Sequence, residues 1–141
     1  MTPRSKAKAT PDPEPQDPEA LKGKKRFEAM FAQQLLAFPG LKVERQLQFA
    51  KSTGRRWRFD FAFPKFKLAV EIDGVVMKKI QGKWYTMGGH ADVTGLRKSN
   101  EKGIAAIMYG WSVLHFLQDE IKPRRAISTT LQVLAQRGWR A

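Results

Sequence analysis

Carboxylates are scarce in this basic chain, and three of them fall on two neighbouring strand-like segments. Asp60 lies in the alternating run from Arg56 to Phe63, and Glu71 and Asp73 lie in the run from Lys67 to Asp73. Successive side chains point to opposite faces of a strand, so Glu71 and Asp73 share one face. If the two strands pair, the three carboxylates converge at one end of a sheet.

Such a cluster suits a divalent cation. Burying unpaired carboxylates beside apolar side chains is costly, so a positive group must offset them. Mg²⁺ (or Mn²⁺) takes oxygen ligands, often one or two carboxylates with phosphate oxygens and water, and a bound ion can lower the pKa of a coordinated water. The pattern favours metal-dependent phosphodiester hydrolysis. The alternative is that the acids form ion pairs with Arg56, Arg58 or Lys67 on a solvated face.

The charge balance of the chain points to a polyanion as its partner. Among 141 residues, 26 are Lys or Arg and 13 are Asp or Glu, a net charge of +13. Residues 27–141 hold 19 of the basic and 9 of the acidic residues. DNA is the first expectation and a membrane surface the second. The absence of cysteine excludes a disulfide scaffold, a thiolate metal site and a cysteine nucleophile. No run of about 18 apolar residues and no signal peptide is visible, so we expect a cytoplasmic protein without a membrane partner.

Hydrophobic periodicity predicts an α/β domain over residues 23–141, preceded by a disordered Pro-rich tail over residues 1–22. The predicted elements are a helix over about 24–38, strands over 43–50, 56–63 and 67–73, a long loop over 75–93, a helix over about 94–109, a strand over 111–117 and a last helix from Pro123.

Two side-chain patterns go with these elements. Alternation predicts that four aromatic residues share one face of the second strand, with Asp60 on the other: Trp57, Phe59, Phe61 and Phe63. Helical spacing places five residues near one face of the helix over 94–109: Leu96, Asn100, Ile104, Ile107 and Met108.

Asp60, a ten-residue spacer and Glu71-Ile72-Asp73 together resemble the PD-(D/E)XK nuclease superfamily. The ordered stretches RRWRFDFAFP, LAVEIDG, GGH, EKGIAA and GWSVLHF, within residues 27–117, resemble its very-short-patch-repair-endonuclease-like branch. The resemblance implies a restriction-endonuclease-like core with a mixed central sheet, in the order helix, β-meander, helix, strand, helix. It also implies a Mg²⁺-dependent DNA endonuclease of a repair or restriction type, which leaves 5′-phosphate and 3′-hydroxyl ends.

The resemblance also implies roles for individual residues. Asp60 and Glu71 would bind the metal, with Asp73 and Glu28 completing the site. Asp73 stands where the superfamily usually has a lysine. Lys102, in the following helix, is expected to supply the missing positive charge, and His90 is the alternative.

Basic residues neutralise phosphates and aromatic residues stack on bases. The expected DNA contacts are Arg55, Arg56, Arg58, Lys78, Lys79, Lys83, Trp84 and Lys98. Two other hypotheses remain open. One is a non-catalytic nucleic-acid-binding domain that keeps the nuclease fold, and the other is a basic scaffold whose acids are only ion-paired. The sequence also leaves open which DNA structure is cut, and whether the protein is a monomer or a homodimer.

Overall fold

The computed structural model describes residues 17–74, 76–87 and 93–141, with the backbone alone at 76–79 and 84–87. Its helices and strands are α1 (Gly23–Leu35), β1 (Glu44–Gln48), β2 (Arg58–Phe63), β3 (Leu68–Ile72), β4 (Val76–Ile80), β5 (Lys83–Met87), α2 (Val93–Met108), β6 (Ser112–Phe116) and α3 (Arg125–Gln136). Short 3-10 turns lie at Pro18–Ala20, Lys51–Thr53, Pro64–Phe66 and Gln118–Glu120.

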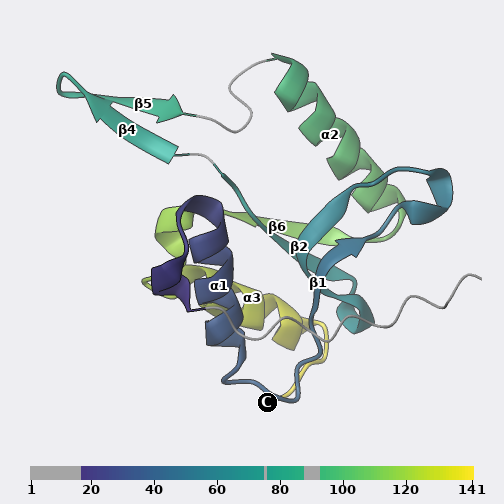
Figure 1. Cartoon of the computed structure of the whole chain (residues 1–141). Coiled ribbons are helices and arrows are strands. Elements are labelled where there is room, and N and C mark those ends of the chain that lie inside the picture. The colour runs from purple at the N-terminus through teal and green to yellow at the C-terminus, as the bar shows by residue number, and fades with distance from the viewer. Residues whose placement is uncertain (1–16, 75, 88–92) are drawn as a thin grey trace, which may run out of the picture.

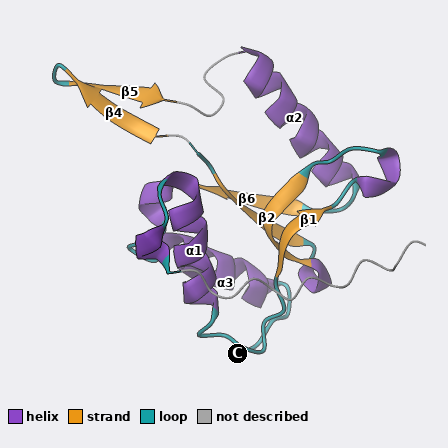
Figure 2. Cartoon of the chain, in the orientation of Figure 1, coloured by secondary structure: helices purple, strands orange, loops and turns teal. Residues whose placement is uncertain are grey.

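A mixed four-stranded sheet in the order β1-β2-β3-β6 forms the centre (Figures 1 and 2). The strands β1, β2 and β3 form an antiparallel meander, and β6 pairs with β3 in parallel after the crossover through α2. The predicted α/β class and the predicted order of helix, meander, helix, strand and helix are therefore confirmed. No helix in the described part of the chain is long and apolar enough to cross a membrane.

The predicted loop over 75–93 contains a hairpin instead. The strands β4 and β5 pair only with each other, apart from the main sheet, and Figure 1 shows them projecting from it. Their connecting residues, Gln81 and Gly82, have φ angles of 50° and 80°. Positive φ at both central residues is the conformation of a type I′ hairpin turn. The sequence Gln-Gly lacks the Asn-Gly or Asp-Gly signal that usually marks this turn.

Residues 17–22, which lie within the predicted tail, are described by the structure and include a turn in contact with α1. Residues 18–20 form a 3-10 turn that packs on α1, and Pro18 is buried. The carboxylate of Asp17 accepts a hydrogen bond from the backbone N–H of Glu19 at 3.0 Å, and Glu19 lies 3.6 Å from Arg26. Residues 1–16 of the predicted tail lie outside the described residues.

The sheet carries a hydrophobic cluster on each face. On the face covered by α1 and α3, Phe61 and Phe63 pack with Phe31, and the rings of Phe31 and Phe61 meet edge to face at 4.8 Å. On the face covered by α2, Ala62 and Ala69 pack against Ala106, and these small side chains allow the helix to lie close to the sheet.

The prediction that four aromatic residues of β2 share one face is wrong. Phe61 and Phe63 belong to the cluster under α1 and α3, whereas Trp57 and Phe59 pack in the cluster under α2. The alternation changes at Asp60, which lies between the two pairs. Opposite it in β1, Gln46 has a positive φ of 56°, which breaks the regular pleat of that strand as well.

We predict that Phe31→Ala lowers the free energy of unfolding by about 3–5 kcal/mol, because the fully buried ring leaves a cavity against Phe61. Leu36→Ala, just after α1, is the matched control. Its side chain is 63% exposed, so the change should stay within about 0.5 kcal/mol. Urea unfolding followed by circular dichroism measures both values, and equal losses would contradict the assignment of the core.

Candidate active site

The site begins where β2 and β3 separate. Their ladder pairs Phe63 with Leu68 and Phe61 with Val70, and the pairing stops there. At the next donor, the backbone N–H of Ile72 bonds to Oδ2 of Asp60 at 2.8 Å. A side-chain carboxylate thus takes the place of a backbone acceptor, and Asp60 is only 5% exposed. The two strands diverge at the position where the sequence places its carboxylates.

Gln46 links this carboxylate to α1. Its Nε2 donates to Glu28 Oε1 at 3.2 Å and to Asp60 Oδ1 at 3.5 Å. Glu28 is buried in α1, on the helix face that carries Phe31. The positive φ of Gln46 is costly for a residue with a side chain, and such strain is often found at functional sites. Sequence reasoning missed Gln46, because no residue type signals this conformation.

Two lysines, from helices on opposite faces of the sheet, pair with the two strand carboxylates. Lys24 Nζ in α1 lies 3.2 Å from each carboxylate oxygen of Asp60. Lys102 in α2 pairs with Glu71. Lys102 therefore points toward the Asp60–Glu71 cluster, as the role expected of it requires. Lys24 was missed, although its position four residues before Glu28 puts both on one helix face.

The carboxyl groups of Asp60 and Glu71 are close enough to share a hydrogen bond, as expected from their spacing, and Asp60 makes the same contact with Glu28. Burial alone would raise the pKa of Asp60, but the Ile72 N–H, Lys24 and these two hydrogen bonds hold it below its usual value. Burial and the neighbouring Asp60 raise the pKa of Glu28 to about 7. Burial also raises the pKa of Glu71 to about 7, with Lys102 opposing and Asp60 adding to the shift.

Asp73 does not join the other carboxylates but turns to β6. Its Oδ1 lies 3.3 Å from Nδ1 of His115, and this contact, against the effect of partial burial, raises the pKa of the imidazole. His115 is the residue of β6 that pairs with Glu71 across the sheet. On the β6 side, Glu71 therefore lies beside His115, whose imidazole contacts the carboxylate of Asp73.

A cleft of about 300 Å³ opens beside these groups, between the end of β3, β6 and α2. Glu71, Asp73, Lys102 and His115 line it together with Lys24, and Phe59 and Ala106 form part of its apolar wall. Groups of both charges therefore face one solvent-accessible space.

The donor set suits a hard cation only in part. Carboxylate oxygens of Asp60 and Glu71 lie together, and Mg²⁺ often binds through one or two carboxylates with water and phosphate oxygens. Within residues 17–74, 76–87 and 93–141, no three His, Cys, Asp or Glu side chains are grouped so that they could hold one ion. The four predicted ligands, which are Asp60, Glu71, Asp73 and Glu28, thus form no ready-made cage, and the Asp60–Glu71 pair is the part that fits.

The predicted DNA contacts are spread over several elements. Arg55, Arg56 and Arg58 are exposed at the start of β2, and the Arg55 guanidinium lies 4.9 Å from the ring centre of Trp57. Lys98 is exposed on α2, and Lys83 is exposed at the hairpin turn. Lys78, Lys79 and Trp84 are in the hairpin strands. His90 lies outside the described residues.

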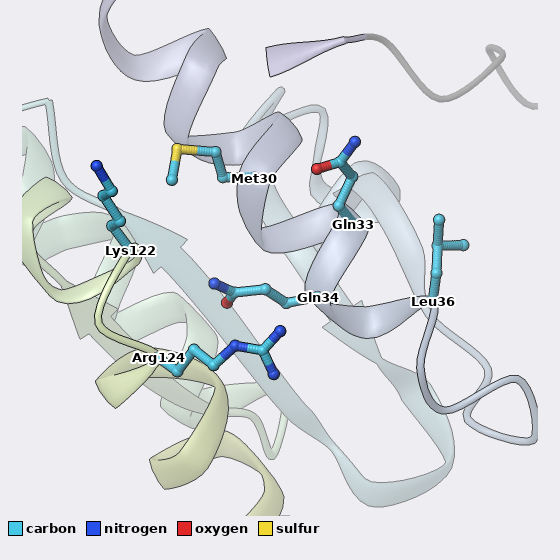
Figure 3. Close-up of a pocket in the computed structure, with 6 residues that line it drawn as sticks. All are labelled: Met30, Gln33, Gln34, Leu36, Lys122 and Arg124. Atoms are coloured by element: carbon cyan, nitrogen blue, oxygen red, sulfur yellow. The ribbon is translucent and has the colours of Figure 1, made fainter. Parts of the chain in front are cut away.

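A second hollow, of about 530 Å³, lies between α1 and the segment that leads into α3 (Figure 3). Its lining includes Lys122, Arg124 and Gln34, whose Nε2 donates to the backbone carbonyl of Ile121 at 2.8 Å. None of the predicted site residues lines this hollow. Three of the predicted catalytic residues, Glu71, Asp73 and Lys102, line the cleft beside Glu71 instead.

We compared the chain with protein-family models, with curated proteins and with solved structures, and none of the three comparisons found a match.

The raised pKa of Glu28 predicts how stability depends on pH. Between about pH 4.5 and 7 the folded chain keeps a proton on Glu28 that the unfolded chain loses, so this group lowers the free energy of unfolding as pH rises through that window. A glutamine at this position does not ionise, so Glu28→Gln removes this pH-dependent contribution to stability. We expect the free energy of unfolding of the variant to fall less between about pH 4.5 and 7 than that of the original chain, and to exceed it above about pH 7.

Urea unfolding at a series of pH values, in EDTA, makes the measurement. Glu44→Gln, at an exposed position of β1, is the control and should follow the profile of the original chain. A Glu28→Gln profile parallel to that of the original chain would show that Glu28 ionises normally.

Proposed function

We propose that the protein is a divalent-metal-dependent DNA endonuclease, using Mg²⁺ or Mn²⁺. The observation that carries the proposal is the buried carboxylate pair of Asp60 and Glu71, placed where β2 and β3 separate and beside a cleft that Lys102 also lines. Buried carboxylates with opposing pKa shifts are typical of functional sites. A chain with a net charge of +13 attracts the phosphate backbone of DNA to this site.

Asp60 and Glu71 would hold the ion, which when bound supplies charge neutralisation of the phosphate and a more acidic water. The Ile72 N–H fixes the orientation of Asp60, because it occupies Oδ2 and leaves Oδ1 to face its neighbours. Burial raises the pKa of Glu71 to about 7, so positive charge near its carboxyl group favours the deprotonated form. Lys102 supplies part of that charge in the chain itself.

In the proposed reaction, water attacks the phosphorus atom and the bond to the 3′ oxygen breaks, which leaves a 5′-phosphate and a 3′-hydroxyl. Lys102 is the cation best placed to stabilise the extra negative charge that develops on the phosphate. His115, in register with Glu71 and held by Asp73, is a second donor toward a phosphate in the cleft. Together these two residues replace the lysine that the superfamily usually has at the position of Asp73.

The second candidate is a non-catalytic nucleic-acid-binding domain with the same fold. It is favoured by the ion pairs themselves, because Lys24 and Lys102 already pair with Asp60 and Glu71. A site whose carboxylates are fully occupied by lysines needs no metal. Cleavage that depends on a divalent ion separates the two candidates.

We predict that the chain converts supercoiled plasmid to nicked or linear DNA in Mg²⁺ or Mn²⁺, and that EDTA or Asp60→Asn abolishes this activity. The amide keeps the shape of Asp60 but loses the charge that would bind the ion. Asp119→Asn, at an exposed position outside the cleft, is the control and should cleave normally.

Agarose gels of the plasmid give the readout, and nicked or linear product shows whether one or both strands are cut. Salt-dependent binding of DNA without cleavage in either metal would support the second candidate. Full activity of Asp60→Asn would place the chemistry elsewhere.

We predict that Lys102→Ala slows plasmid cleavage by roughly 10²–10³-fold, the typical effect of losing one preorganised charge-stabilising donor, while DNA affinity changes little. Lys98→Ala, one turn earlier on the exposed side of α2, is the matched variant. It should weaken DNA binding and lower the slope of log affinity against log salt by about one, with cleavage at saturating enzyme unchanged. Single-turnover cleavage and a salt series of binding measurements separate the effects, and equal losses of both in the two variants would contradict the assignment.

A further inference from the structure

The apolar face of α2 points away from the body of the protein. Five of the eight large hydrophobic side chains that are exposed in the described residues belong to this helix: Val93, Leu96, Ile104, Ile107 and Met108. Ile104 is 59% exposed and Ile107 is 73% exposed. The opposite face of the helix carries Ala106 and Lys102, which meet the sheet and Glu71. The helix therefore presents two different faces, and the apolar one has no partner in the described part of the chain.

Two of the segments outside the described residues contain few apolar side chains that could cover this face. Residues 1–16 contain only Met1, Ala7 and Ala9 as apolar residues, and residues 88–92 contain only Ala91. Figure 1 shows α2 at the periphery of the molecule, with α1 and α3 on the other side of the sheet. A second copy of this chain carries the same apolar face and can therefore supply an occupant.

The apolar face is self-complementary about Asn100. Val93 lies seven residues before Asn100 and Ile107 lies seven residues after it, while Leu96 and Ile104 lie four residues before and after it. Two copies of α2 that cross antiparallel at Asn100 would place Val93 against Ile107, and Leu96 against Ile104, of the second copy. The two Asn100 side chains would meet at the centre, where a polar residue in an apolar seam fixes the register.

Charges beside the seam favour the same arrangement. Arg97 and Glu101 are exposed on one flank of the apolar face, and neither forms an ion pair within the described residues. In an antiparallel pair related by a twofold axis, equal flanks of the two helices face each other. Arg97 of each copy then lies beside Glu101 of the other.

We propose that α2 is a homodimer interface, in which the apolar face of one copy packs antiparallel against that of a second copy of this chain, centred on Asn100. A helix of 16 residues is about 24 Å long, so the helix pair buries less area than a standard protein interface and we expect a reversible dimer. The proposal does not rest on the proposed nuclease activity. In this dimer the two clefts that Lys102 lines would lie on the outer sides of the helix pair. Each cleft would then face one strand of a DNA duplex.

Sedimentation of the full chain over a series of concentrations, without DNA, tests the interface. We expect a monomer–dimer equilibrium, and Ile104→Asp should raise the dissociation constant at least tenfold. Leu36→Asp, an equally drastic change at an exposed apolar site outside α2, is the control and should leave the equilibrium unchanged. Thermal unfolding by circular dichroism should show that both variants fold, because both side chains are exposed in the monomer.

A charge exchange tests the antiparallel register. Arg97→Glu and Glu101→Arg should each weaken the dimer, by roughly two- to tenfold for exposed pairs formed twice, and the double variant should restore it. A chain that stays monomeric at every concentration, or a dimer unaffected by Ile104→Asp, would overturn the interface. A double variant weaker than both single variants would overturn the register. None of these measurements involves DNA cleavage, so they stand or fall apart from the proposed activity.

Discussion

The hydrogen bond from the backbone N–H of Ile72 to Oδ2 of Asp60 is the contact on which the site depends. Without it, a buried backbone donor would lack a partner at the point where β2 and β3 separate. With it, the strands can diverge, Phe59 can turn to the α2 side, and a cleft can open beside Glu71. The same bond stabilises the charged form of Asp60, so the structural constraint and the electrostatics of the site have one cause.

The site contains more carboxylate groups than its lysines balance, although the chain as a whole is strongly basic. Lys24 approaches Asp60 from α1, and Lys102 approaches Glu71 from α2, so each carboxylate is paired by a helix on a different face of the sheet. These pairs do not fully balance the cluster, because Glu28 and Glu71 still have pKa values of about 7. A divalent cation bound at the carboxylates would neutralise the remaining negative charge, while the basic surface would contact the phosphates of DNA.

Much of this arrangement follows from local sequence patterns, and the missing parts depend on tertiary contacts. The order of the elements follows from periodicity, and the approach of Asp60 to Glu71 follows from the spacing of two paired strands. The change of face at Asp60 could not be predicted, because alternation assumes a regular strand and nothing in the residue types indicates the positive φ of Gln46. Lys24 was missed because its role depends on how α1 docks on the sheet.

The orientation of α2 shows why counting large apolar residues can mislead. Its small residues, such as Ala105 and Ala106, pack over Ala62 and Ala69 of the sheet, because a helix can approach a sheet closely only with small side chains at the contact. This docking turns Lys102 inward to Glu71 and leaves Ile104 and Ile107 in water. Had the larger residues faced the sheet, Lys102 would point to solvent and Glu71 would be buried without a cation. Exposure of the apolar face is therefore a consequence of the packing that brings Lys102 into the site.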